Sequence, residues 1–197
     1  PMTACSDDVT VPSIIRTIFR ATDGTLWFVT GTGVTRYDGT TWVSLDEGDG
    51  LLRGFLGQTV EGANRGLWFG HENGLTCYEP VIATNPMPAV LVQTDQVYTN
   101  LQALPHITDG RLVTFKVNAV DFRTRPEKRL YRYAVVPGHV DSAPARANAT
   151  WQPATRNAEF EWLSNARGQY TFFAQSIDRD LNYSTPAVAQ LTIVPPW

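Results

Sequence analysis

The 197-residue chain has no apolar run near the roughly 18 residues that a membrane span requires, and its longest apolar stretches, such as 89–92, have the length of a strand. Its two cysteines allow at most one disulfide, which excludes a disulfide-stapled scaffold. Only 18% of the residues are charged and the net charge is −3, so nucleic acid is not an expected partner. The chain also lacks a phosphate-binding loop, a nucleophile elbow and a kinase signature, and we predict neither an enzyme nor a bound cofactor.

Metal-ligand patterns are equally sparse. The three histidines, His71, His106 and His139, lie far apart, and none has a cysteine or histidine at metal-binding spacing. What the chain does contain is apolar: 43% of its residues are hydrophobic and 11% are aromatic, which indicates a folded core and argues against disorder. We therefore expect a folded protein without a metal centre.

An internal repeat dominates the first half of the chain. Residues 26–38 align without gaps on residues 67–79 at a constant offset of 41 residues, with Trp27 matching Trp68 and Tyr37 matching Tyr78. Turn residues divide each copy into short β-branched runs, at 15–20, 25–30, 34–37 and 41–45, and then at 56–61, 66–69 and 74–78. Four short strands in about 40 residues are typical of a β-propeller blade.

We thus predict two blades of the four-stranded propeller type over residues 1–80, in which Pro80 and Pro86 remove the fourth strand of the second blade. Two blades cannot close a propeller of ~4–8 blades. Open strand edges invite pairing with another copy, so we expect self-association through residues 1–80.

The second half of the chain has a different pattern. A proline-rich linker at 81–88 precedes a domain at 89–197, whose strand-like runs fall at 90–93, 99–101, 112–117, 130–135, 158–162, 169–176 and 187–194. Alternating hydrophobicity and turns at ~10-residue intervals are typical of an immunoglobulin-like or fibronectin-like β-sandwich. The predicted fold class is therefore all-β.

Both halves resemble one family. The pattern from Asp23 to Asp38, Asp-Gly-x-Leu-Trp-Phe-x-Thr-x-x-Gly-Val-x-Arg-Tyr-Asp, resembles the propeller repeat of two-component regulators. The series Tyr131-Arg132-Tyr133, Trp151, Gly168-Gln169-Tyr170 and the Pro-Pro-Trp ending is similar to the three-tyrosine domain that follows such propellers. Two departures are an insertion between 134 and 150, and Phe160 in place of a usual tyrosine.

The resemblance implies a function. The chain would be a fragment of the extracytoplasmic, periplasmic sensor of a bacterial two-component regulator, usually a histidine kinase, and would pass ligand binding to a membrane helix that follows residue 197. By the same resemblance a small carbohydrate is an expected ligand. With the open strand edges of residues 1–80, we expect a homodimer or higher self-association. Two alternatives stay open, a carbohydrate-binding or accessory β-module of a secreted enzyme and a structural self-assembly module.

We predict that the motif residues hold the fold and do not contact ligand. These residues are Trp27, Tyr37, Trp68, Tyr78, Tyr131, Tyr133, Trp151, Gly168 and Tyr170.

Three further features have two interpretations each. Asp178, Asp180 and Asn182 alternate as calcium ligands do, but Tyr183 and Ala189 replace the Gly and Glu of an EF-hand, so a plain turn is the favoured reading. A basic run would contact phosphate or an acidic sugar, or, as we expect, form a solvated turn between two strands. Its members are Arg123, Arg125, Lys128, Arg129 and Arg132. Cys5 and Cys77 would form a disulfide in an oxidising compartment, or, as we expect, remain free thiols.

Overall fold

The computed structural model describes residues 14–54, 56–140 and 149–196. These residues form fifteen β-strands and two short 3₁₀ helices, η1 (Glu47–Asp49) and η2 (Pro126–Lys128), which confirms the all-β prediction. No helix in the described part of the chain has the length and apolarity that a membrane span requires.

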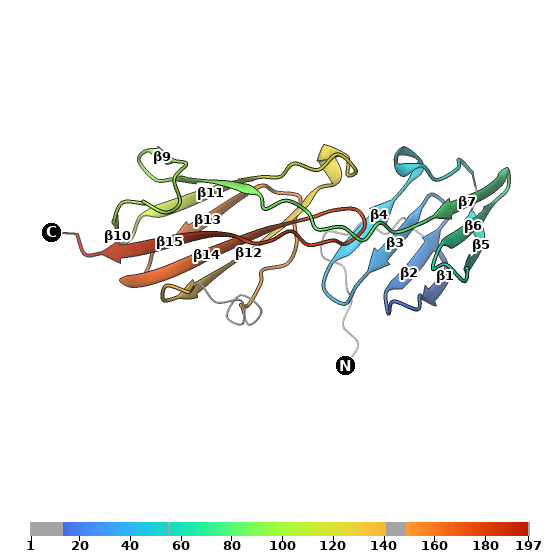
Figure 1. Cartoon of the computed structure of the whole chain (residues 1–197), viewed down its shortest axis with the longest axis horizontal. Coiled ribbons are helices and arrows are strands. Elements are labelled where there is room, and N and C mark those ends of the chain that lie inside the picture. The colour runs from blue at the N-terminus through green and yellow to red at the C-terminus, as the bar shows by residue number, and fades with distance from the viewer. Residues whose placement is uncertain (1–13, 55, 141–148, 197) are drawn as a thin grey trace. The chain divides into compact units, whose positions relative to one another are not determined.

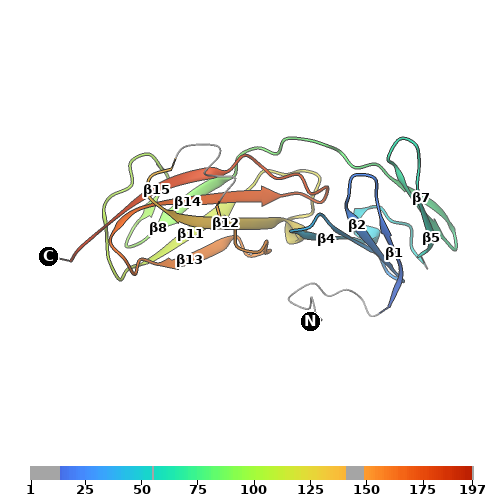
Figure 2. The same ribbon diagram turned by 90° about the horizontal axis from the view of Figure 1, so that it is seen from below.

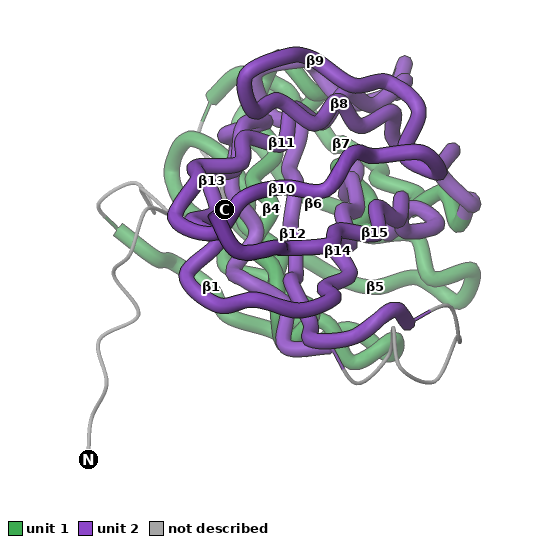
Figure 3. Tube along the Cα trace, turned by 90° about the vertical axis from the view of Figure 1, so that its left-hand side faces the viewer, with its two compact units in different colours: residues 1–82, 179–181 green, residues 83–178, 182–197 purple. Residues whose placement is uncertain are grey.

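The chain divides into two compact units (Figure 3). The first contains residues 1–82 together with 179–181, and the second contains residues 83–178 and 182–197. The first division falls within the predicted linker. No sequence pattern predicts that residues 179–181 belong to the first unit. Because they do, the polypeptide passes between the units at three points.

The first unit contains two antiparallel sheets (Figure 1). The first-repeat sheet has the order β1 (Ile15–Arg20), β2 (Leu26–Thr30), β3 (Val34–Tyr37) and β4 (Trp42–Leu45). The second-repeat sheet has the order β5 (Leu56–Glu61), β6 (Leu67–His71) and β7 (Gly74–Tyr78). The second sheet has three strands within the described residues, so a full set of four strands occurs only in the first repeat.

The two repeat sheets pack through aromatic side chains. Trp27, on β2, lies 5.8 Å from the ring of Phe69 and 5.4 Å from the ring of Tyr78, measured between centroids. Trp27, Val29 and Phe69 are almost completely buried. Burial of these large apolar groups is the main force that holds the sheets together.

The second unit is a sandwich of two four-stranded sheets, and Figure 2 labels strands of both. One sheet has the order β10 (Ile107–Thr108), β15 (Ala187–Val194), β14 (Gly168–Ile177) and β12 (Leu130–Pro137). The other has the order β13 (Glu159–Leu163), β11 (Leu112–Asn118), β8 (Ala89–Gln93) and β9 (Val97–Tyr98). The pairing of β10 with β15 is parallel, and the other pairings are antiparallel.

Two strands of this unit differ from expectation. The predicted strand at 99–101 is wrong, because Asn100 forms a turn there: its side-chain oxygen accepts a hydrogen bond from the Gln102 amide, and its carbonyl accepts one from the Ala103 amide. The strand β10 was not predicted, since two residues are too few to show an alternating pattern.

The core of the sandwich lies between its sheets. Phe115 and Phe172 stack with their ring centroids 3.7 Å apart, and both side chains are fully buried. On the other face of the β10-β15-β14-β12 sheet, Phe173 and Ala134 pack with Trp151 in a second, smaller cluster. Part of the insertion that follows β12 therefore covers apolar residues on this face of the sheet.

Candidate functional site

A hydrogen-bonded network in the first unit begins at Asp23, in the turn between β1 and β2. One carboxylate oxygen of Asp23 accepts bonds from the Thr25 amide (2.8 Å) and the Thr25 hydroxyl (2.6 Å). The Thr25 hydroxyl in turn accepts a bond from the Trp27 indole nitrogen at 3.0 Å. The turn thereby satisfies the polar atom of a tryptophan whose ring is buried between the sheets.

Arg36 extends this network from β3, where it stands opposite Trp27 in the strand register. Its side chain is only 7% exposed, and its Nη2 donates to the other oxygen of Asp23 at 2.9 Å. Its Nη1 donates to the Asp180 carbonyl at 3.0 Å, and its guanidinium lies 5.3 Å from the centre of the Trp27 ring. The positive charge of Arg36 is therefore balanced by a carboxylate, a carbonyl dipole and an aromatic face.

Tyr78 and Asp180 complete the network. The Tyr78 hydroxyl donates a short hydrogen bond to the Asp180 carboxylate and lies 3.4 Å from Arg36 Nη1. Burial raises the pKa of Tyr78, and the hydrogen bond to Asp180 raises it further. Tyr78 is thus held as a neutral donor.

The pKa of Asp23 shifts in the opposite direction. Burial by itself raises that pKa, but the two Thr25 hydrogen bonds and the charge of Arg36 outweigh burial, so the pKa lies below its usual value of 3.8. Asp23 and Arg36 consequently form a charged pair at neutral pH.

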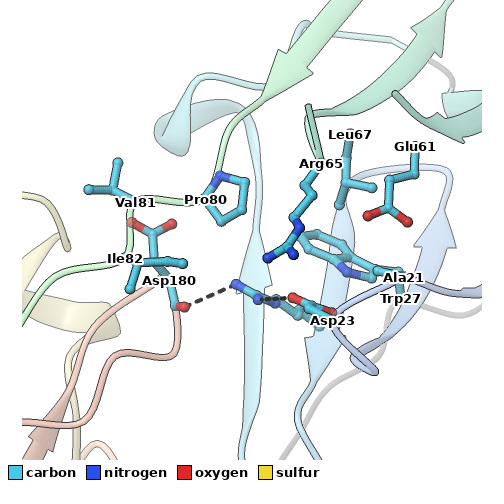
Figure 4. Close-up of a pocket in the computed structure, with 11 residues that line it drawn as sticks. Ala21, Asp23, Trp27, Glu61, Arg65, Leu67, Pro80, Val81, Ile82 and Asp180 are labelled. Carbon is cyan, nitrogen blue, oxygen red and sulfur yellow. Dashed lines mark hydrogen bonds and ion pairs between the residues drawn. The ribbon is translucent and has the colours of Figure 1, made fainter. Parts of the chain in front are cut away.

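Asp23, Trp27, Arg36 and Asp180 line a small cavity of about 70 Å³ (Figure 4). Arg65, Glu61 and Leu67 from the second repeat contribute to its walls, together with Pro80 and Ile82. A volume of this size holds a few water molecules but not a sugar ring, since ligand pockets occupy about 300–1,000 Å³. The described network is accordingly suited to stabilising the packed sheets.

A second, more open groove of about 250 Å³ lies on the first-repeat sheet. Its lining includes Arg20, Leu26, Tyr37 and Asp38. No group of three histidine, cysteine, aspartate or glutamate side chains in the described part of the chain is arranged to hold a metal ion.

The predicted motif residues of the repeats lie in different surroundings. Trp27 is buried, whereas Trp68 at the matching position is 40% exposed. Tyr37 stacks on Trp42 with a centroid distance of 4.2 Å, and its hydroxyl donates to the Gly39 carbonyl. Tyr78 packs edge-on against Trp27.

The motif residues of the sandwich mostly face its core. Tyr131 is buried there, and Tyr133 and Tyr170 pack against the same cluster. Phe160, which stands where a tyrosine is usual, is buried and lies 4.4 Å from Tyr133 between ring centroids. Gly168 begins β14 with φ of +135°, a backbone conformation that favours glycine.

Trp151 belongs to a different cluster. The Arg132 guanidinium lies 4.4 Å from the Trp151 ring centre and 4.3 Å from that of Tyr183. Arg132 also donates two bonds, of 2.9 and 2.8 Å, to the Gln175 side-chain oxygen. These contacts hold Arg132 and Trp151 within the sandwich.

The remainder of the basic run follows the same trend. Arg129 donates to the carbonyls of Ala119 (3.2 Å) and Asp121 (2.5 Å), and Arg125 pairs with Glu127. These two arginines therefore make contacts inside the protein.

The three residues that alternate as calcium ligands do, Asp178, Asp180 and Asn182, fall in different units. Asp178 accepts bonds from the Asn182 amide and the Asn182 side chain, both at 2.9 Å, which closes the turn between β14 and β15. Asp180 instead belongs to the network around Arg36. Among the described residues Cys77 is an exposed free thiol, and Cys5 lies outside them.

Sequence reasoning missed the roles of Asp23, Arg36 and Asp180. A signal for the first two is present, because both positions change together between the repeats, to Asn64 and Cys77. When an acidic and a basic residue of one repeat are both replaced by uncharged residues in the other repeat, the joint change indicates that the two charged residues are in contact.

Comparison with solved structures bears on the fold. The chain is similar to the crystal structure of the extracellular domain of a proposed hybrid two-component system from B. thetaiotaomicron, with a TM-score of 0.50 and 19% sequence identity. The match covers 92% of this chain and 26% of the other, so residues 1–197 span less than a third of that extracellular domain. At this identity the likeness establishes a shared fold.

Two further structures match at lower scores, which carry no argument. One is the extracellular domain of a proposed one-component system from B. thetaiotaomicron, with a TM-score of 0.40, 14% identity and coverage of 93% of this chain and 30% of that one. The other contains fibronectin(III)-like modules of Clostridium thermocellum CbhA, with a TM-score of 0.34, 14% identity and coverage of 87% and 85%. No family model matches the chain, and no curated protein matches it significantly.

Proposed function

We propose that this chain is a non-catalytic part of the extracytoplasmic sensor of a bacterial two-component regulator. The observation that carries the proposal is the fold that it shares, over 92% of its length, with the extracellular domain of a proposed hybrid two-component system. The resemblance of residues 23–38 to the regulator repeat, and of the tyrosine series in residues 131–170 to the three-tyrosine domain, supports the same function.

The proposed mechanism is a population shift. A ligand that binds one arrangement of the sensor more tightly biases the protein toward that arrangement, and the bias passes through the chain to a membrane helix and a histidine kinase. The polypeptide connects the two units at three points, after residues 82, 178 and 181, which supports mechanical coupling between them. The ligand class that we propose from the family resemblance is a small carbohydrate.

The coding sequence that follows residue 197 tests this function. We expect it to encode a membrane-spanning helix and then a signalling domain. A glycoside hydrolase domain in that place would overturn the sensor function and favour an accessory module of a secreted enzyme.

Ligand class is tested separately on the sensor's complete extracytoplasmic region. We expect calorimetric titration with neutral and acidic di- to hexasaccharides to give saturable heat with at least one of them. Absence of binding throughout the panel would overturn the carbohydrate proposal while leaving the sensor function to the coding-sequence test.

A further inference from the structure

Equivalent faces of the two repeat sheets differ in how far they are buried. Trp27 and Trp68 are matched by the 41-residue offset, yet Trp27 is 1% exposed and Trp68 is 40% exposed. In the strand register Trp68 lies opposite Val60 and Cys77, and Leu75 lies opposite Gly70 on the same side of the sheet. We call this surface, formed by Val60, Trp68, Leu75 and Cys77, the Trp68 face.

The Trp68 face is apolar, and its side chains are exposed in the part of the chain that the structure describes. Val60 is 63% exposed, Leu75 is 66% exposed, and Cys77 is exposed as well. A cluster of large exposed apolar side chains is unusual on the surface of a monomer and marks a contact surface.

The structure shows what covers the matching face of the first repeat. Trp27 packs against Phe69 and Tyr78, which lie on the opposite side of the second-repeat sheet from Trp68. Leu67 shares that side, because it stands opposite Tyr78 in the register, and it is 2% exposed. A tryptophan face in this protein is thus buried by the Leu-x-Phe side of a neighbouring repeat.

The first repeat carries the same covering side on its own outer surface. The 41-residue offset matches Leu67, Phe69 and Tyr78 with Leu26, Phe28 and Tyr37. The strand register places these residues and Ile18 on one side of the sheet, because Leu26 lies opposite Tyr37 and Phe28 lies opposite Ile18. Ile18 is 58% exposed, and Phe28 and Tyr37 are partly exposed. We call the surface formed by Ile18, Leu26, Phe28 and Tyr37 the Phe28 face.

The cavity and the groove of the first unit support the same match between the covering sides of the two repeats. The cavity beside Arg36 is walled on the second-repeat side by Glu61, Arg65, Leu67 and Pro80. The open groove on the first repeat is lined by the residues that precede these by 41 positions, Arg20, Gly24, Leu26 and Gly39. The groove therefore has the lining of one half of the closed cavity, without the other half.

We propose that the Trp68 face of one copy of this chain packs on the Phe28 face of a second copy, which repeats the packing of Trp27 against the second-repeat sheet. Trp68 of the first copy then contacts Phe28 and Tyr37 of the second copy. The two faces are different surfaces of the chain, so the contact is head-to-tail and can add further copies. The inference goes beyond the proposed sensor function, and it is argued from the packing within residues 1–197 alone.

The contact between copies should be weaker than the contact between the two repeats of one chain, because it lacks one pair of hydrogen bonds. Inside one chain, Glu61 accepts bonds from the Thr22 amide (2.8 Å) and the Thr22 hydroxyl (2.6 Å). The positions matched to Glu61 and Thr22 in the copy-to-copy contact are Arg20 and Ala63, which cannot form the hydroxyl-to-carboxylate bond. We therefore expect reversible, concentration-dependent association.

Sedimentation of the full chain, combined with one variant in each face, tests the proposal. We expect the mass of the wild-type species to rise with concentration above 21.9 kDa, the mass of one chain. Trp68→Glu and Ile18→Glu should each remain monomeric when alone. An equimolar mixture of the two should form a heterodimer, because each variant retains the face that the other lacks.

Several results would overturn the proposal. A wild-type chain that is monomeric at every concentration excludes the contact. Loss of association in Trp68→Glu without rescue by the mixture indicates a symmetric contact or an unrelated surface. Leu75→Glu, on the Trp68 face, should behave as Trp68→Glu does, whereas the matched control Leu112→Glu, an exposed leucine of the second unit, should associate as the wild type does. Unchanged far-UV circular dichroism shows that each variant is folded.

Discussion

Arg36 donates a hydrogen bond of 3.0 Å to the carbonyl of Asp180, 144 residues further along the chain. The same guanidinium binds the Asp23 carboxylate, so a single side chain joins the turn of the first repeat to residue 180. Tyr78, from the second repeat, reaches Asp180 as well. The network thereby connects both repeats with the short segment 179–181 of the first unit.

Replacement of Arg36 by methionine should destabilise the first unit. The variant keeps most of the side-chain volume but leaves the Asp23 carboxylate without its charged partner. Asp23 is 36% exposed, so water offsets part of the loss, and we expect about 2 kcal/mol, between the values for exposed and buried pairs. Urea denaturation measures the change.

The matched control for this variant is Arg53→Met. Arg53 also pairs with a carboxylate, that of Glu47, but its side chain is 88% exposed. We expect a change of less than about 0.5 kcal/mol. Equal effects at Arg36 and Arg53 would contradict the structural role of the Arg36 network.

Asp23 should make the stability of the first unit depend on acid pH. Its pKa in the folded protein lies below the usual 3.8, so the folded state binds protons less readily than the unfolded state. The contribution is complete above pH 3.8 and is lost as the pH falls through the folded pKa. Asp23→Asn should therefore lose less stability than the wild type when the pH is lowered from 5 to 3 (about one unit either side of 3.8), and parallel curves would contradict the assignment.

Tyr78 should act at the opposite end of the pH scale. Burial and the bond to Asp180 raise its pKa above the usual 10.0, so the neutral hydroxyl stabilises the folded state fully below pH 10.0 and this stabilisation is lost as the pH rises above that value. Tyr78→Phe should cost about 2 kcal/mol at neutral pH, because the Asp180 carboxylate loses a donor. The gap between wild type and variant should narrow in thermal denaturation above pH 10.0; a constant gap would contradict this role.

How far the sequence predicts this structure depends on the range of each interaction. The strands of both repeats and most of the sandwich could be placed because alternation and turn residues act within a few positions, as in β2 and β14. The Arg36 contact with Asp180 could not, since no local pattern relates residues 144 positions apart. Residue 180 also lies in a turn whose neighbours, Asp178 and Asn182, bind each other, and the local spacing predicts that turn without indicating the partner of Asp180.

Replacement of Arg65 by glycine should stabilise the protein. It adopts φ of +63° at the place in the second repeat where the first has Gly24, with φ of +89°. A left-handed backbone costs an L-residue about 1–2 kcal/mol, part of which is offset by the greater unfolded-state freedom of glycine. Arg65→Gly should therefore gain about 0.5–1 kcal/mol in urea denaturation. Arg65→Ala removes the long side chain but keeps the strain, so an equal gain in both variants would attribute the effect to the side chain.

Phe172 should be a main source of stability in the sandwich. It is 0% exposed and stacks on Phe115 in the core, and its truncation to alanine removes a large apolar side chain and leaves a cavity. We expect Phe172→Ala to cost about 3–5 kcal/mol in the unfolding of the second unit. The matched control is Phe122→Ala, because Phe122 belongs to the same unit and is 97% exposed, and it should change stability by less than about 0.5 kcal/mol. Urea denaturation measures the free energy of unfolding of both variants. Comparable losses of stability in the two would contradict the placement of Phe172 between the two sheets.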